Sequence, residues 1–366
     1  MTAATDARAG RTSMPNALKS GHLPRWTELW ILLGSAVLVG LIFIPLNYNL
    51  AGGLIVMALL YLVAIGVISR VVENRRQAID RIVRALVTIA FILAMIPLVS
   101  TLWTVIANGI GQMNWSFVSQ TGGSVFDPET LEVTQEPGAL QAIVGTLIIT
   151  GIAAVISIPI GILTAVWLTE YSRPGQAVRR IITFLVDVMT GIPSIVAGLF
   201  AFSLFALIVG PKAFSGFSAA IALCVLMIPT VVRSSEEMIR LVPNELREAS
   251  YALGVTKYHT IIKVVLRTAF AGLVTGVVLA VARVIGETAP IFIAASFTDN
   301  FNANPFEGPM QTLPVLAYTG YKFPTTNPEA SLQSAWGAAL LLVLLVIVFN
   351  LIARIVARYF APKTRR

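Results

Sequence analysis

Runs of apolar residues long enough to cross a lipid bilayer recur along this sequence. Spanning the hydrocarbon core takes about 20 predominantly apolar residues in a helix. Because lipid offers no partners for backbone N–H and C=O groups, such runs are expected to cross as helices. The sequence therefore predicts an all-α integral membrane protein with about eight transmembrane helices. They are expected at about residues 29–46, 50–69, 85–107, 141–168, 181–209, 217–232, 269–295 and 335–353.

The composition is typical of a membrane protein and argues against several classes of site and function. Only 12% of the residues are charged, whereas a soluble domain carries roughly 25%. The single cysteine, Cys224, excludes an intrachain disulfide. His22 and His259 have no cysteine or acidic partner at a ligand spacing, so no metal site is expected. The sequence also pairs no nucleophile with a base, so no catalytic residues are expected and an enzyme is the least favoured class.

The positive charge is concentrated in alternate connections between the apolar runs. The net charge is +8, and all but three of the 26 lysines and arginines fall on one predicted side. Cytoplasmic loops of membrane proteins carry this excess, so the charge indicates topology and no nucleic-acid partner is expected. Both termini are therefore predicted to be cytoplasmic. The basic segments are residues 1–28, 70–84, 169–180, 233–267 and the C-terminal end from residue 354.

Two connections on the opposite side are longer than a link between helices requires. They cover residues 108–139 and 298–334, and the first contains four acidic residues and no basic one. Two interpretations stay open for these segments. They are solvated linkers, or they form a docking surface for an external partner.

The polar segment 233–267 is the longest one on the basic side that separates two apolar runs. Pro243 ends a preceding helix, and Asn244 is expected to cap a new one. Gly254 suits the left-handed conformation that follows a helix, and Thr256 is expected to cap a second helix. The pattern predicts two short amphipathic helices with a glycine bend. They form either a docking elbow or a helix pair that lies on lipid headgroups.

A motif in this segment favours the docking elbow. Glu248, Ala249 and Ser250, followed after three residues by Gly254, resemble the EAA loop of ABC-transporter permease subunits. The chain departs from that pattern by having Ser250 in place of the second alanine, and also at Val264 and Arg267, where the pattern has isoleucine and proline.

The resemblance to the EAA loop implies a partner that hydrolyses ATP. In that family the elbow inserts into a groove of the ATPase subunit and transmits its closure to the membrane helices. This sequence contains no G-x-x-x-x-G-K-[ST] phosphate loop. A separate subunit is therefore expected to bind ATP with Mg, and this chain is expected to bind no cofactor and to be a transporter subunit.

Two pairs of charged residues lie in or beside apolar runs. Arg283 and Glu287 are four residues apart and are expected to share one helical face inside the membrane. An arginine at such depth costs about 2.5–3.5 kcal/mol, so it is expected to face protein or water. Arg233 and Glu236 form a second pair near the inner boundary. Each pair is either an ion pair without a ligand or a site for an oxyanion, which the guanidinium fork matches.

Asp187, another carboxylate within an apolar run, is expected to be structural because no partner is evident.

The segment from Arg283 to Pro290 reads R-V-I-G-E-T-A-P, and it resembles the signature A-R-x-x-G-E-T-A-P of the PstA-type permeases of bacterial phosphate importers. Segments 138–147, 191–200 and 233–243 are similar to the same family. The resemblance covers about residues 82–358 and implies a six-helix type I ABC importer (MetI-like) permease core. In the family, residues that match Arg233, Glu236 and Arg283 are implicated in phosphate transport.

The resemblance implies a set of partners and a location. The partners are phosphate, a sister PstC-type permease, a dimeric PstB-type ATPase on the cytoplasmic side and an external PstS-type phosphate-binding protein. The location is the bacterial cytoplasmic membrane, where lipid surrounds the multi-pass chain.

Three divisions of the chain are expected. Residues 1–28 form a cytoplasmic tail, residues 29–75 an additional transmembrane hairpin, and residues 76–366 the ABC permease domain with its coupling loop at 233–267. Six-span members of the family lack an equivalent of the hairpin. It is expected to be a lipid-facing accessory.

These observations favour a transmembrane permease subunit of an ATP-driven phosphate importer, which forms the anion path with a sister permease. A permease for sulfate or another oxyanion is the nearest alternative. A secondary anion transporter is less favoured, because it has no reason to keep a docking elbow for an ATPase.

Overall fold

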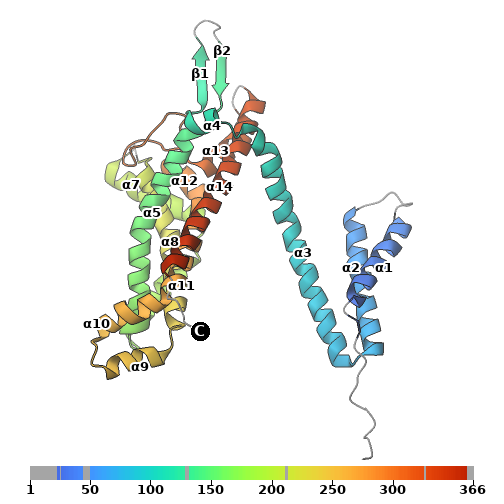
Figure 1. Ribbon diagram of the computed structural model, residues 1–366. Coiled ribbons are helices and arrows are strands. Elements are labelled where there is room, and N and C mark those ends of the chain that lie inside the picture. Colours follow the sequence, from blue (N-terminus) through green and yellow to red (C-terminus); the bar gives the residue numbers. More distant parts are fainter. Residues whose placement is uncertain are drawn as a thin grey trace, which may run out of the picture. The chain divides into compact units, whose positions relative to one another are not determined.

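The computed structural model describes residues 23–24, 26–43, 50–127, 132–210, 213–324 and 327–360. The chain divides into two compact units, one up to residue 102 and one from residue 103 onward. Figure 1 labels both strands and most of the helices of the two units. The tail predicted over residues 1–28 lies almost wholly outside the described residues.

The N-terminal unit contains three apolar helices joined by buried charges. Glu73 follows the second helix, and its carboxylate accepts hydrogen bonds of 2.7 Å from Nε and Nη2 of Arg81. Arg81 also donates to Glu28 at 2.7 Å, so one guanidinium joins all three helices. We call Glu28, Glu73 and Arg81 the N-terminal cluster. The helices are α1 (Thr27–Phe43), α2 (Leu50–Val72) and α3 (Arg75–Gly109), most of which belongs to this unit.

The hydrogen bonds to Arg81 lower the pKa of Glu73 to about 2, helped by the backbone N–H of Leu23 and the hydroxyl of Ser69 and opposed by burial. Glu73 therefore keeps its negative charge at any pH that cells maintain. The predicted hairpin of residues 29–75 corresponds to α1 and α2. Its boundary with the permease domain at residue 75 stays a prediction.

The C-terminal unit is built around the contact between α5 and α8, the most extensive helix pair of the described residues. Small residues let these two backbones approach closely. A Cβ atom on Gly161 would come within 2.6 Å of Val231, so this crossing requires glycine. Alanines and Met227 fill the core between the helices. The helices are α5 (Leu140–Val166), α8 (Gly216–Arg240), α11 (Leu266–Ile285) and α14 (Pro328–Phe360).

Two of the predicted spans are broken helices. The run at 181–209 divides into α6 (Ala177–Thr190) and α7 (Ser194–Val209), which are bent by 107°. Gly191 and Pro193 explain the break, because a residue before proline avoids the helical conformation. The run at 269–295 divides into α11 and α12 (Ala289–Ala295). The prediction of one continuous helix was wrong in both cases.

Six helices of the described residues are long and apolar enough to span a membrane, and the bent pair adds a seventh if it counts as one span. The helix α1 is apolar but shorter. The all-α membrane class is confirmed, but the count of about eight is not. One helix exceeds its prediction, because α8 continues through Pro229 to Arg240. Residues 233–240 of the predicted coupling loop are therefore helical.

The two long connections on the predicted outer side contain secondary structure of their own. The first folds back on the start of α5, where Gln141 exchanges hydrogen bonds of 3.0 and 3.1 Å with the backbone of Gly122. The second is held by Thr146, whose hydroxyl accepts from the backbone N–H of Leu313 at 2.8 Å. Neither is a plain linker. The elements are α4 (Trp115–Ser119), the antiparallel hairpin of β1 (Gly123–Asp127) and β2 (Glu132–Glu136), and α13 (Leu313–Lys322).

Candidate functional site

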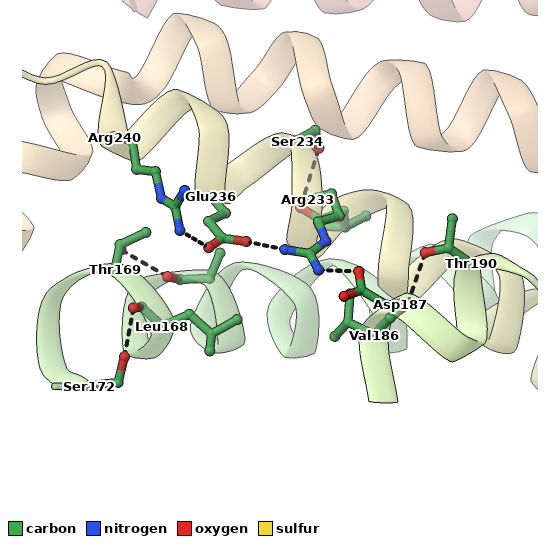
Figure 2. Close-up of polar contacts among 12 residues, drawn as sticks. Leu168, Thr169, Ser172, Val186, Asp187, Thr190, Arg233, Ser234, Glu236 and Arg240 are labelled. Atoms are coloured by element: carbon green, nitrogen blue, oxygen red, sulfur yellow. Dashed lines mark hydrogen bonds and ion pairs between the residues drawn. The ribbon is translucent and has the colours of Figure 1, made fainter. Parts of the chain in front are cut away.

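Four charged side chains of α6 and α8 form a row of alternating sign in the C-terminal unit (Figure 2). Arg233 donates to Glu236 at 2.9 Å through one nitrogen and to Asp187 through the other. Arg240 binds the second oxygen of Glu236. The order is Asp187, Arg233, Glu236, Arg240, and we call these four residues the charge row. It contains two positive and two negative groups, so its formal charge is zero.

The two carboxylates of the row lie in different surroundings. The side chain of Glu236 is 6% exposed and receives a guanidinium on each oxygen. A carboxylate buried in this way is stable only if it is paired. The side chain of Asp187 is 58% exposed, and its one partner in the row is Arg233. Glu236 is therefore held by two ion pairs, whereas Asp187 is held by one.

The helical repeat and one apolar contact explain how the row forms. Glu236 lies three residues after Arg233 and four before Arg240, so all three share one face of α8. Val186, next to Asp187, packs with Leu168 and the α8 residue Val232 in a small buried cluster. This contact sets α6 against α8 at the level of Arg233. The prediction that Asp187 is a structural carboxylate without a partner missed this pairing, because 46 residues separate it from Arg233.

Arg283 and Glu287 do not form the arrangement predicted for them. The helix α11 ends at Ile285 with Gly286 as its C-cap, so Glu287 lies beyond the helix. The prediction of a shared helical face was therefore wrong. Among the described residues neither side chain takes part in an ion pair within 4.0 Å. Arg283 is exposed in the last turn of α11, where the helix dipole favours a cation.

Close contacts between α8 and α11 place Arg283 relative to the charge row. A Cβ atom on Gly272 would meet Met238, and one on Gly276 would meet Ser234, beside Arg233. The two helices therefore run in opposite directions. Arg283 follows Gly276 by seven residues, which is roughly 10 Å farther along the helix axis. The two arginines lie at different depths on neighbouring helices.

The structure confirms two short helices with a glycine bend after α8. They are α9 (Asn244–Ala252) and α10 (Lys257–Thr260), and Gly254 between them has a φ of 75°. We call residues 244–260 the coupling elbow. Pro243 occupies the N-cap of α9 and Asn244 is already helical, so the prediction that Asn244 is the cap was wrong. Thr256 is the N-cap of α10 as predicted, although its side chain makes no capping hydrogen bond.

The motif residues of the elbow divide into exposed and buried positions. Glu248, Ala249 and Gly254 are exposed. Ser250 is buried, and its hydroxyl lies 2.8 Å from the hydroxyl of Thr260. This hydrogen bond joins the two helices of the elbow at the position where the EAA pattern has alanine. Apolar side chains at the surface of the elbow include Leu246, Tyr251, Leu253 and Tyr258.

Arg247 fixes the elbow to two long helices. Its guanidinium donates to Glu170, just after α5, with distances of 2.8 and 3.2 Å. It also donates to the backbone carbonyls of Ile239 and Val242, at 3.1 and 2.6 Å, where α8 ends. The two side chains of the ion pair are 15% and 7% exposed. Arg247 therefore joins α9 to α5 and to the end of α8, where the carbonyl of Ile239 also accepts from the backbone N–H of Val242. Sequence reasoning missed this residue because Glu170 lies 77 residues away.

Comparisons with known proteins agree with this architecture. The family described as "Binding-protein-dependent transport system inner membrane component" matches residues 157–366. The "Phosphate transport system permease protein PstA 1" of Mycobacterium tuberculosis is 43% identical over 302 residues, which cover 82% of this chain and 94% of that protein. The "Phosphate transport system permease protein PstA" of Mycobacterium leprae is 41% identical over 289 residues, 78% of this chain and 90% of that protein.

A solved structure supports the fold. The crystal structure of a bacterial alginate ABC transporter in complex with an alginate pentasaccharide-bound periplasmic protein includes a chain that is similar to this one with a TM-score of 0.55. The similarity covers 76% of this chain and 95% of that one, at 14% sequence identity.

Proposed function

The chain belongs to the family of binding-protein-dependent transport system inner membrane components, and within it to the PstA-type permeases, and from this we propose that it is the permease subunit of an ATP-driven phosphate importer. The observation that carries the proposal is the similarity to phosphate permeases over most of both chains. The chain has residue types that can bind phosphate along a transport path. Arginines at two depths, Arg283 and Arg233, offer guanidinium forks to a tetrahedral oxyanion.

Phosphate enters from the side of the two long connections in this proposal. A PstS-type binding protein docks there, on surfaces that include the β1–β2 hairpin and α13, and releases its anion. Arg283 is free of ion pairs among the described residues and meets phosphate first. Arg233 lies roughly 10 Å farther along the path. A sister PstC-type permease forms the opposite wall, and neither arginine is expected to hold phosphate tightly, because transport requires release.

In this proposal the coupling elbow receives the conformational change of the ATPase that drives transport. A dimeric PstB-type ATPase binds ATP with Mg and docks on the exposed face around Glu248, Ala249 and Gly254. Arg247 passes the motion to α8, which contains Arg233 and Glu236. In this proposal the elbow and both termini lie on the cytoplasmic side of the bacterial cytoplasmic membrane, an orientation that the lysines and arginines concentrated in these segments support.

A permease for sulfate or another oxyanion is the remaining alternative, because a guanidinium binds any tetrahedral oxyanion. A secondary anion transporter is less favoured. The elbow is joined to the end of α5 by the Arg247–Glu170 ion pair and to the end of α8 by hydrogen bonds of Arg247, and such a transporter has no reason to keep these contacts.

The test is ATP-dependent uptake of labelled phosphate and sulfate in cells that lack their own phosphate importer. The cells express this chain with its sister permease, ATPase and binding protein. Wild type is expected to take up phosphate, and Arg283→Gln is expected to lose uptake while the complex still assembles. Arg354→Gln, which changes an exposed arginine of α14, is the matched control and is expected to retain uptake. Uptake of sulfate alone would assign the chain to the alternative.

A further inference from the structure

We propose that Asp187 is a tethered anion that occupies Arg233 between transport events and is displaced when phosphate binds there. It thereby sets how firmly the path holds phosphate and how readily it lets phosphate go. The inference rests on the proposed function, because it concerns the step in which phosphate reaches Arg233. It adds a residue that neither the motifs nor the similarity to other permeases assigns to transport.

The contacts of Arg233 show why an incoming anion meets competition. One terminal nitrogen of its guanidinium donates to Glu236 and the other to Asp187 (Figure 2). The two carboxylates take one N–H from each terminal nitrogen, so together they occupy both arms of the fork, although a guanidinium has five N–H donors in all. Phosphate that binds through both terminal nitrogens also meets two negative charges there, so its binding is favoured when one carboxylate moves away.

Exposure and partners select Asp187 as the carboxylate that leaves. Glu236 is 6% exposed and holds Arg240 as well as Arg233, so its movement would leave a buried charge and break two ion pairs. Asp187 is 58% exposed and breaks one ion pair. Its carboxylate is exposed on the surface of this chain, so it can turn away from Arg233 without leaving a buried charge.

The net charge of the row also indicates that Asp187 is the carboxylate that leaves. With all four members paired, the row has no net charge and repels or attracts an anion only weakly. Once Asp187 moves away, the remaining residues Arg233, Glu236 and Arg240 have a net charge of +1. The row therefore binds an anion only in the state that Asp187 has left, and the return of Asp187 expels the anion by like-charge repulsion.

The position of Asp187 gives this exchange a structural consequence. It lies four residues before Gly191, where α6 ends and α7 begins at an angle of 107°. The ion pair with Arg233 is a polar anchor between the end of α6 and α8, beside the apolar contact of Val186 with Val232. Displacement of Asp187 releases this anchor next to the bend, so phosphate binding and movement of α6 are linked.

The test is equilibrium binding of radiolabelled phosphate to the purified complex of this chain, its sister permease and the ATPase, without binding protein or nucleotide. Asp187→Asn removes the competing charge and keeps the size of the side chain. It is expected to bind phosphate about tenfold more tightly than wild type, a difference of about 1.4 kcal/mol. Asp187→Glu keeps the charge and is expected to bind like wild type.

Two further variants show whether the gain arises at Arg233. The double variant Asp187→Asn with Arg233→Gln is expected to bind no more tightly than Arg233→Gln alone. Asp80→Asn also removes an aspartate–arginine ion pair, the exposed one with Arg84 in the N-terminal unit. It is expected to leave phosphate binding unchanged. Size-exclusion chromatography of every complex shows that assembly is intact.

Unchanged or weaker binding in Asp187→Asn would overturn the inference and make Asp187 a residue that only positions Arg233. A gain that persists without Arg233 would overturn it too. The proposed function fails separately, if the wild-type complex with its binding protein takes up no phosphate when ATP is present. Tighter phosphate binding by the assembled Asp187→Asn complex, lost when Arg233 is also replaced, supports the inference, and phosphate uptake by the wild-type complex supports the proposed function.

Discussion

The two ion-pair clusters of this chain are built from the same residue types but differ in charge balance and access. In the N-terminal cluster one arginine, Arg81, serves two carboxylates, and the side chains of Arg81, Glu73 and Glu28 are 18%, 1% and 37% exposed. In the charge row two arginines alternate with two carboxylates, and both ends are open, with Asp187 and Arg240 58% and 59% exposed. A less exposed cluster with a net negative charge joins helices and repels an anion. An open, balanced row can exchange one member for phosphate.

The largest effect that separates the two clusters is on stability. Arg81→Gln leaves the buried carboxylate of Glu73 without its ionic partner, which costs about 3–5 kcal/mol. Unfolding of the detergent-solubilised chain, followed by a probe in α2, measures this loss. Arg84→Gln is the matched control, because its ion pair with Asp80 is exposed on both sides and is worth about 0–1 kcal/mol. Equal stability of the two variants would remove the structural role assigned to the N-terminal cluster.

Arg247 extends the comparison to an ion pair outside both clusters, the one with Glu170, whose proposed role is to transmit motion. Arg247→Leu separates the coupling elbow from α5 and from the end of α8. Phosphate taken up per ATP hydrolysed is expected to fall about 5–150-fold, the usual range of a coupling free energy. Uptake and hydrolysis by the reconstituted complex measure this ratio. Lys263→Gln changes an exposed cation nearby and is expected to leave the ratio intact. An unchanged ratio in Arg247→Leu would contradict the role of this joint.

The pH dependence of stability tests the N-terminal cluster in another way. The pKa of Glu73 is about 2, below its usual value of 4.5. A lowered folded-state pKa means that the stabilisation is present above about pH 4.5 and is lost as the pH falls toward 2. The melting temperature reported by a probe in α2 is therefore expected to stay constant from pH 7 to 5 and to fall below pH 4.5. Glu73→Gln is expected to remove this fall in melting temperature. A fall of the same size in this variant would show that other groups cause it.

The smallest expected effect concerns a neutral pair in the elbow. Ser250→Ala removes the hydroxyl that bonds Thr260, but Thr260 keeps its hydrogen bond of 3.2 Å to the backbone carbonyl of Thr256. Stability is expected to fall by about 0.5–1.5 kcal/mol, and phosphate uptake is expected to change less than about twofold, because the EAA pattern itself has alanine here. Loss of uptake in this variant would show that the hydroxyl pair acts in coupling.

The sequence predicted the membrane class and the two short helices of the elbow, because each depends on local pattern, whereas the roles of Arg233 and Arg283 stay predictions. Hydrophobic runs, the glycine of the elbow at Gly254 and the charge at Arg233 are all visible within one helix or turn. The breaks at Gly191 and Gly286 were missed because each lies within a continuous apolar run. Hydropathy alone does not reveal a bend that only a few residues make. The partners of Asp187 and Arg247 were out of reach, since they lie 46 and 77 residues away and only helix packing brings them together.

The most direct test of the account compares Arg233→Gln with Arg81→Gln in ATP-dependent phosphate uptake, normalised to the amount of assembled complex. The account predicts that Arg233→Gln loses uptake, since the charge row then has no arginine that can exchange Asp187 for phosphate. It predicts that assembled Arg81→Gln complex transports at close to the wild-type rate. Uptake that survives in Arg233→Gln and fails in Arg81→Gln would contradict it, because the anion path would then depend on the N-terminal cluster.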